Sequence, residues 1–265
     1  MALCRLVRKF FRIGCAHIDG NDGSFIKQIL RKEDPLTTIT EVEMQTPRTA
    51  SEFRAWVEMA LKKIGATKDG KRQLRFRTGI AKPLVEEALP LGILCDTYFD
   101  ASPDVTVEHI LGNQNFDVLI TDKRSTPVRF RYLEITQAHE GENEHLRMLA
   151  LDREGHVNLL GKVRKTGSKH TGITVDVENE AKRHSDVLAG ELERVKKGLN
   201  RKMGKSYREN TGLLVVLDDY VAIKDQDDVA ALKTVLREYA QKLDTFCWIG
   251  AVGWSGKTFV EQRFQ

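Results

Sequence analysis

Two acidic residues stand among apolar and aromatic neighbours in the run NFDVLITDKRSTPVRFRYLEITQAH, residues 115–139. Asp117 lies in FDVLI and Glu134 lies in YLEIT, and each segment has the composition of a β-strand. A carboxylate that is buried in a sheet without a partner costs free energy, so each acid should have a compensating group. Two neighbouring carboxylates also repel each other, unless one takes up a proton or a cation lies between them.

The positions of the two acids allow them to share one face of a sheet. Side chains alternate along a strand, so Glu134 and Thr136 point to the same side. Asp117 precedes Glu134 by 17 positions (134 − 117), and a turn between the strands can bring the two together. Mg²⁺ prefers a few carboxylates together with waters and phosphate oxygens, which makes the pair a candidate metal site. The alternative is that each acid is solvated or pairs with Arg129 or Arg131.

Three strand-like runs are predicted to position these acids. The runs cover residues 105–111, 116–121 and 128–137. Their short connectors, GNQN and DKRSTP, favour an antiparallel meander. A helix is predicted before the meander over residues 81–92, and Pro90 and Gly92 should end it.

The second half of the sequence is predicted to complete an α/β fold. Residues 138–172 are polar and punctuated by glycine, which indicates a β-hairpin insertion. A long amphipathic helix follows over 176–203, and the almost wholly apolar run 211–220 is typical of a central strand. A helix over 226–243 and a hairpin through 246–262 come last. The expected architecture is a mixed central sheet with helices on both faces.

The N-terminal third is predicted to be helical. Residues 47–66 have a helical apolar pattern with Ser51 as a candidate cap, and residues 25–32 suit a short helix. The segment 68–71 reads as a turn, and the basic, amphipathic residues 1–18 suit a surface helix or a mobile arm better than a secretory signal. The expected division is a helical extension over 1–80 that packs on a core over 81–265, with the insertion at 138–172.

The composition is that of a globular protein. Of the 265 residues, 41% are hydrophobic and 30% are charged, which is enough apolar material for a core. The formal net charge of +4 is a mild excess and does not by itself indicate nucleic acid. The four cysteines are scattered, which favours reduced thiols and a cytoplasmic protein, and no apolar run approaches the length of a membrane span.

The order helix, strand, strand with Asp, strand with Glu, helix, strand over roughly residues 80–220 resembles the PD-(D/E)xK, or restriction-endonuclease-like, nuclease superfamily. The resemblance implies that Asp117 in NFD and Glu134 in LEITQ are catalytic metal ligands and that the Ile135 carbonyl is a further ligand. It implies Mg²⁺, with Mn²⁺ as an alternative, and hydrolysis of phosphodiester bonds in DNA. Dimeric action, common among such nucleases, makes a homodimer an expectation.

Members of this superfamily often carry another acid on the helix before the meander. Glu86 and Glu87 are the candidates, and helical spacing from Ile80 and Leu84 favours Glu87. Glu108 on the first strand is a possible substitute.

The sequence departs from the superfamily pattern two residues after Glu134, where the family lysine is replaced by Thr136. Three explanations stay open: another element supplies the cation, Thr136 or Gln137 suffices with a metal, or the protein has lost catalysis. Lys202 is the best candidate for a relocated cation, because it can flank the apolar stripe of the long helix. The alternative is that Lys202 is a solvated charge near a helix C-terminus.

Two basic segments are candidates for contacts with a phosphate backbone. The first is GKVRKTGSKH, which offers Lys162, Arg164, Lys165 and Lys169 around glycines, and Lys205 follows the long helix. The second is the stretch over 68–82, and both could equally be solubilising loops.

The leading hypothesis from the sequence is therefore a Mg²⁺-dependent endonuclease that acts on DNA. The runner-up is a catalytically inactive module on the same fold that binds nucleic acid or a protein partner. A weaker option is a different enzyme that uses the region between His139 and His145, although no HExxH or Cys/His zinc pattern is present in the sequence.

Overall fold

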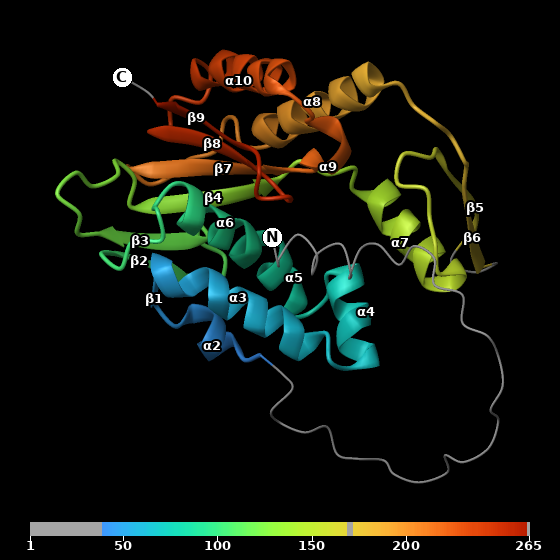
Figure 1. Ribbon diagram of the computed structural model, residues 1–265, viewed down its shortest axis with the longest axis horizontal. Helices are drawn as coiled ribbons and strands as arrows, with labels where there is room; N and C mark the ends of the chain where they lie inside the picture. The colour runs from blue at the N-terminus through green and yellow to red at the C-terminus, as the bar shows by residue number, and fades with distance from the viewer. Residues whose placement is uncertain (1–38, 169–171, 264–265) are drawn as a thin grey trace, which may run out of the picture.

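A mixed seven-stranded sheet forms the centre of the molecule in the computed structural model, which describes residues 39–168 and 172–263 (Figure 1). The predicted segments at 1–18 and 25–32, and Lys169, lie outside the described residues. The strand order is β1-β2-β3-β4-β7-β8-β9. The strands are β1 (Arg48–Thr49), β2 (Val105–His109), β3 (Val118–Asp122), β4 (Tyr132–Gln137), β7 (Thr211–Leu217), β8 (Trp248–Gly253) and β9 (Phe259–Arg263).

The direction of the strands changes at β4. Strands β1 to β4 are antiparallel neighbours, which confirms the predicted meander, whereas β4, β7 and β8 run parallel. β9 returns antiparallel to β8, as the predicted C-terminal hairpin requires. Parallel strands need crossover helices, and these are α8 (His184–Asn200) and α10 (Gln226–Ala240).

Helices cover both faces of the sheet, as predicted (Figure 1). One face packs against the N-terminal helices, and the other packs against α8 and α10. β7 is buried at every position because Leu213 and Val215 face α8 and α10 while Leu214 and Val216 face the N-terminal layer. The N-terminal layer comprises α2 (Glu41–Gln45), α3 (Ala50–Ile64), α4 (Lys68–Phe76), α5 (Ala81–Pro83), η2 (Leu84–Ala88) and α6 (Leu89–Thr97).

The prediction that Pro90 and Gly92 end a helix is wrong, because the helical path continues to Thr97. A wide π-turn over Leu84–Ala88 precedes Pro90, which then lies in the first turn of α6. A proline has no N–H to donate to the carbonyl four positions earlier, here that of Glu86. The Nε2 atom of Gln137, on β4, donates to the Glu86 carbonyl instead. The missing helical hydrogen bond is thus replaced by a hydrogen bond between the helix and the sheet.

The predicted turn at 68–71 is instead the start of α4. The Thr67 side chain accepts the Gly70 N–H and caps the helix, which explains why GKR continues as helix rather than loop. The predicted helix over 47–66 is confirmed as α3, although Thr49 and not Ser51 is its N-cap residue.

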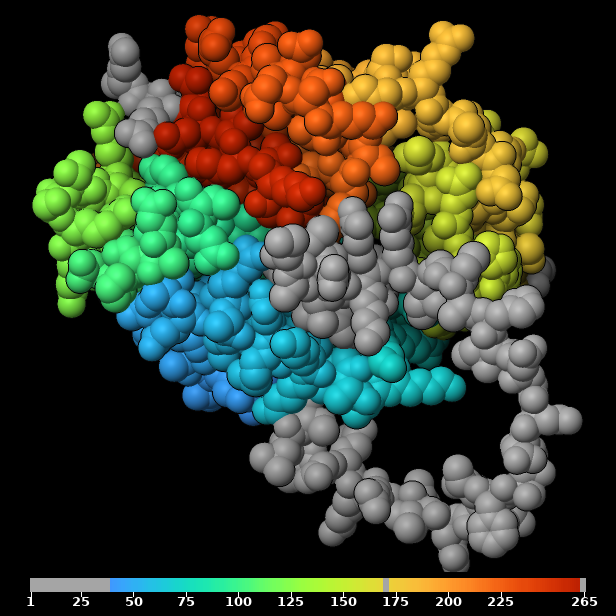
Figure 2. Space-filling model, viewed as in Figure 1, coloured from blue at the N-terminus to red at the C-terminus, as the bar shows by residue number. Residues whose placement is uncertain are grey.

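The insertion between β4 and α8 holds more than the predicted hairpin. Helix α7 (Glu142–Glu154) precedes the two-stranded sheet of β5 (Val163–Ser168) and β6 (Gly172–Val177), so the long helix begins at His184 and not at 176. Leu146 and Ala150 of α7 pack against Val175 of β6 in a small separate core. In Figure 2 this insertion, coloured yellow-green to gold, forms one side of the molecule.

No helix among the described residues is long and apolar enough to span a membrane. The short helix α9 (Asp219–Ala222) follows β7 and completes the set of described elements that surround the sheet.

Gly250 is predicted to be intolerant of a larger side chain. A Cβ at this position would lie 2.1 Å from the Trp248 ring, which is held by its Nε1 donating to Glu261 at 2.8 Å. We expect Gly250→Ala to lower the free energy of unfolding by roughly 1–3 kcal/mol in urea titrations. Gly190→Ala on α8 is the control: the nearest atom to its Cβ, on Arg194, is 3.8 Å away, and helix propensity favours alanine by about 1 kcal/mol. Equal effects of the two substitutions would contradict this account.

Candidate functional site

Asp117 lies where β3 separates from β4. The last described pair of that ladder is Val118 with Leu133, and the Asp117 N–H still donates to the Leu133 carbonyl at 2.8 Å. The Asp117 carboxylate then replaces a backbone acceptor, because its Oδ2 accepts the Ile135 N–H at 2.6 Å. Asp117 is thereby fixed beside the segment of β4 that contains Glu134.

Glu134 projects from β4 toward α8, on the face opposite Leu133 and Ile135. Its Oε1 accepts a hydrogen bond from Lys202 Nζ, which comes from the turn after α8. The side chains of Lys202 and Glu134 are only 14% and 12% exposed, so the ion pair is largely shielded from water. The ion-pair partner of Glu134 is thus Lys202, which neither the solvated nor the arginine-paired alternative had named.

The close packing of α8 on β4 explains why Lys202, just after the end of α8, reaches Glu134. A Cβ on Gly198 would lie 3.7 Å from the Gln137 carbonyl oxygen and 3.9 Å from Thr136 Cγ2, so the helix backbone passes directly over Thr136. One helical turn later, about 6 Å along the axis, comes Lys202. Two strand residues before Thr136, about 6.6 Å away, comes Glu134. The distance from Gly198 to Lys202 along the helix thus matches the distance from Thr136 to Glu134 along the strand. Lys202 therefore lies over Glu134.

Thr136 and Gln137 both lie between secondary-structure elements. Thr136 is 5% exposed under α8. Gln137 donates to the Glu86 carbonyl, and its own carbonyl accepts from Arg201 Nη2 at 2.6 Å. Both residues hold secondary-structure elements together around the acids.

Glu87 is the helix acid that faces the site. His109 at the end of β2 holds it, with 2.6 Å between His109 Nε2 and Glu87 Oε2. His109 is fully buried, and its Nδ1 has no partner among the described residues. Glu86 turns elsewhere and lies 3.6 Å from Arg77 Nη1, whereas Glu108 lies opposite Leu119 in the β2–β3 ladder.

The electrostatic environment of Asp117 disfavours its ionised form. Burial raises the pKa of Asp117 well above its usual value, and the negative charges of Glu134 and Glu87 raise it further. Burial also raises the pKa of Tyr207, with the charges of Glu134 and Asp117 as additional causes. Tyr207 therefore lies in the same negative field, which the single ammonium of Lys202 does not neutralise.

The carboxylate oxygens of Asp117 and Glu134 are suitable ligands for a hard divalent cation. Asp117 Oδ1 and Glu134 Oε2 have no hydrogen-bond partner among the described residues, and neither is a fully buried atom. Two carboxylate oxygens and surplus negative charge are what such a cation requires, and waters and phosphate can complete its shell. Within residues 39–168 and 172–263, however, no three His, Cys, Asp or Glu side chains form a ready metal site. The Ile135 carbonyl would be a third protein ligand.

The predicted phosphate-binding residues do not all lie on a free surface. On β5, Arg164 pairs with Glu178, and Lys165 pairs with Glu142 at 2.6 Å. Lys162 is exposed near the start of the hairpin, and Lys205 is exposed in the loop after α8. Among the described candidates, Lys205 alone shares the loop after α8 with Lys202 and Tyr207, so it is the one closest in sequence to Lys202.

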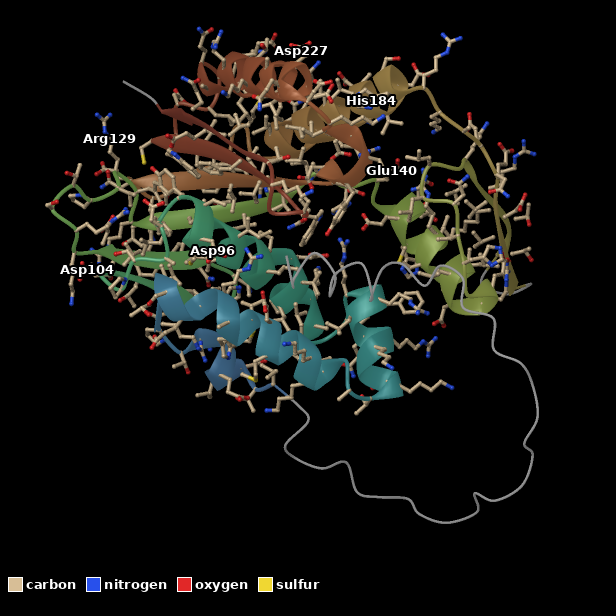
Figure 3. The ribbon with its side chains drawn as sticks, viewed as in Figure 1. Asp96, Asp104, Arg129, Glu140, His184 and Asp227 are labelled. Carbon is tan, nitrogen blue, oxygen red and sulfur yellow. The ribbon has the colours of Figure 1, made fainter. Side chains whose placement is uncertain are left out.

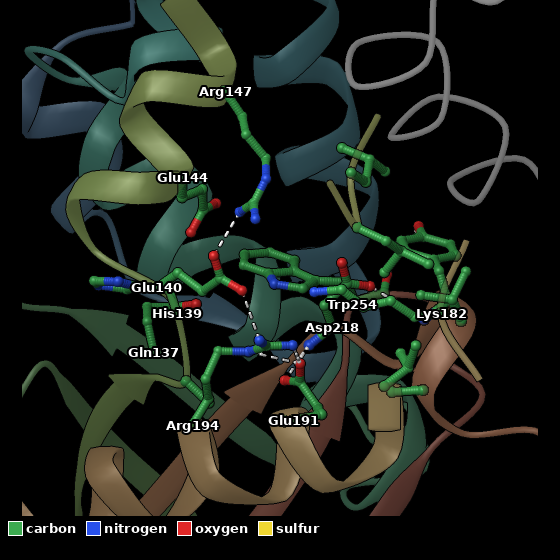
Figure 4. A pocket seen from close by; sticks show the side chains of 18 of the residues that line it. Gln137, His139, Glu140, Glu144, Arg147, Lys182, Glu191, Arg194, Asp218 and Trp254 are labelled. Atoms are coloured by element: carbon green, nitrogen blue, oxygen red, sulfur yellow. Dashed lines mark hydrogen bonds and ion pairs between the residues drawn. The ribbon is translucent and has the colours of Figure 1, made fainter. Parts of the chain in front are cut away.

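A separate cavity of about 240 Å³ lies beyond the end of β4 (Figure 4). Glu140 links Arg147 of α7 at 2.6 Å to Arg194 of α8 at 2.8 Å, and Arg194 also pairs with Glu191. Figure 3 places Glu140 and Arg129 at opposite ends of the sheet. The cavity is not lined by Asp117, Glu134 or Lys202. It is a junction between the insertion and the core.

His139 and His145 make separate local contacts. His139 Nδ1 accepts the Gly141 N–H at 2.8 Å, while the His145 ring meets the Phe76 ring at 5.7 Å.

Comparisons of the chain with protein-family models, with curated proteins and with solved structures found no significant match.

Asp117→Asn should stabilise the folded protein at mildly alkaline pH without added metal. The raised pKa of Asp117 means that its ionised form is disfavoured on folding, and asparagine can still accept the Ile135 N–H. Each kcal/mol gained should raise Tm by roughly 2–4 °C in a domain of this size. Mg²⁺ should raise the Tm of the wild-type protein more than that of the variant.

Asp122→Asn is the control at the other end of β3. Burial raises the pKa of Asp122, but its bonds to Arg124 and the Val128 N–H outweigh this and leave that pKa below its usual value. The Asp122 charge therefore stabilises the fold, and the control should lower Tm. A fall in Tm for both variants would argue against charge repulsion at Asp117.

Glu191→Gln should flatten the dependence of stability on pH. Burial raises the pKa of Glu191 to about 7, against the lowering effect of Arg194. Between the usual value of 4.5 and about 7 the folded protein keeps a proton that the unfolded chain releases, so the free energy of unfolding falls as pH rises. The variant should lose this slope in urea titrations across that range. Glu193→Gln, at an exposed neighbouring position, should retain it.

Proposed function

We propose that the protein is a divalent-cation-dependent nuclease that hydrolyses phosphodiester bonds in DNA. The observation that carries the proposal is the meeting of Asp117, Glu134 and Lys202 from three different elements, with one carboxylate oxygen of each acid left for a cation. The resemblance of the element order to PD-(D/E)xK nucleases supports the same activity, and it suggests Mg²⁺ or Mn²⁺.

The acids have the roles of holding the cation and setting its charge environment. Asp117 and Glu134 would bind the cation, and the Ile135 carbonyl would be the backbone ligand. When bound, such a cation lowers the pKa of a water and neutralises charge on a phosphate. Glu87 adds negative charge behind Asp117, and its bond to the buried His109 fixes its direction.

Lys202 would stabilise the negative charge that develops on the phosphate in the transition state. An ammonium has three N–H donors, and the bond to Glu134 uses one of them. The other two can donate to phosphate oxygens or orient the attacking water, which is the role of the family lysine that Thr136 replaces. Because Lys202 is largely shielded from water, its charge acts more strongly than that of a surface lysine.

A second candidate is a nuclease-fold module without catalysis. The Lys202–Glu134 ion pair and the Asp117–Ile135 hydrogen bond favour it, since they give both acids a protein partner without any metal. The two candidates differ in their response to Mg²⁺.

We expect Mg²⁺-dependent cleavage of plasmid or oligonucleotide DNA by the wild-type protein and none by Asp117→Ala or Glu134→Ala. Lys202→Met should lower kcat by about 10²–10³-fold through the loss of transition-state stabilisation. Lys196→Met is the matched control on α8, since Lys196 pairs with Glu193 at the surface, and it should leave kcat unchanged. Cleavage that survives both acid substitutions would falsify the nuclease proposal, and DNA binding with no cleavage after Mg²⁺ is added would favour the inactive module.

A further inference from the structure

A cluster of two aromatic rings and one guanidinium lies next to the acid pair. The Phe116 and Tyr132 ring centroids are 4.7 Å apart. The Arg208 guanidinium carbon lies 5.1 Å from the Phe116 centroid and 5.3 Å from that of Tyr132, so Arg208 covers both rings. We refer to Phe116, Tyr132 and Arg208 as the stacking platform.

The platform is fixed at a short distance from the reactive groups. Phe116 directly precedes Asp117, and Tyr132 lies two residues before Glu134 on the same face of β4. Two strand residues span about 6.6 Å, so a base on the platform would place its own or the adjoining phosphate near the acids.

The platform has an outer surface that a ligand can reach. Phe116 is buried, Tyr132 is half-buried and Arg208 is exposed, so the guanidinium is the outermost layer of the stack. Arg131 lies 5.8 Å from the Tyr132 ring centroid, and Lys205 is exposed nearby in the loop. None of Arg131, Lys205 and Arg208 forms an ion pair with another described residue, which leaves their charge for an anionic partner.

The loop that carries Arg208 is held in place before any ligand binds. Asn115 Nδ2 donates to the Ser206 carbonyl at 2.8 Å, and the Tyr207 ring packs against Phe246 at 4.4 Å. The Arg208 carbonyl accepts from Thr211 Oγ1 at 2.7 Å. Little ordering of the backbone is therefore needed for Arg208 to receive a partner.

We propose that the stacking platform binds one unpaired base of single-stranded DNA, beside the phosphate that the acid pair addresses. Planar guanidinium and aromatic groups stack on nucleobases, while nearby cations attract the backbone. Bases inside an intact duplex have both faces covered by their neighbours, so only an unpaired base can use the platform. The assignment of a phosphate to the acid pair rests on the proposed nuclease function, whereas base stacking does not.

Binding without cleavage tests the platform directly. The Asp117→Asn protein in EDTA is titrated with a short single-stranded deoxyoligonucleotide and with a blunt-ended, fully paired duplex of equal length, each carrying a base whose fluorescence falls on stacking. We expect tighter binding and stronger quenching with the single strand. Arg208→Ala in the same background should weaken single-strand binding by roughly 5- to 150-fold, the range measured for one stacked base.

Two further variants separate stacking from charge. Arg208→Lys keeps the charge but loses the plane, so it should also lose most of the quenching. Arg237→Ala removes one exposed arginine from α10 and should change neither binding nor quenching. Equal affinity for single-stranded and duplex DNA would overturn the proposal that the platform stacks a base. The same would follow if Arg208→Lys bound and quenched as strongly as the parent protein.

The outcome for the platform is independent of the outcome for catalysis. Single-strand preference and quenching in a protein that never cleaves DNA with Mg²⁺ would support the platform and reject the nuclease. Mg²⁺-dependent cleavage that is confined to duplex DNA and indifferent to Arg208→Lys would reject the platform and support the nuclease.

Discussion

The close approach of α8 to β4 at Gly198 is the constraint on which the site depends. A Cβ at that position would lie 3.7 Å from the Gln137 carbonyl oxygen and 3.9 Å from Thr136 Cγ2, which is van der Waals contact, so the helix backbone lies directly over the strand. The matching rise of helix and strand then brings Lys202 to Glu134, while Thr136 is buried beneath the helix. The position of Lys202 is thus a geometric consequence of the packing between these two elements.

The π-turn before Pro90 determines where the Glu87 carboxylate lies. Pro90 leaves the Glu86 carbonyl without its helical donor, and Gln137 bonds to it from β4. That link secures the π-turn against the sheet and holds Glu87 within the field of Asp117. Burial and the charges of Glu134 and Glu87 together raise the pKa of Asp117.

The strong periodic signals in the sequence predicted much of the fold. The meander, the central strand β7, the C-terminal hairpin and α3 were all predictable from apolar patterns and turns, and helical spacing led to Lys202 and Glu87. Helix α4 was missed because a threonine cap outweighed the turn signal of Gly70, and α7 because its apolar stripe serves a small local core. The contact of Glu87 with His109 and the position of Tyr207 join segments far apart in sequence, which no local pattern encodes.

The pairing of Glu134 with Lys202 spans 68 positions, with the whole insertion between the two residues. Both acids therefore precede their cation during synthesis of the chain, and α7 and the β5–β6 hairpin emerge before α8 can dock on β4. The three groups come together only when that docking is complete. A nascent or partly folded chain would carry the acids without the lysine, so the arrangement of all three groups exists only in molecules whose sheet and crossover helix have assembled.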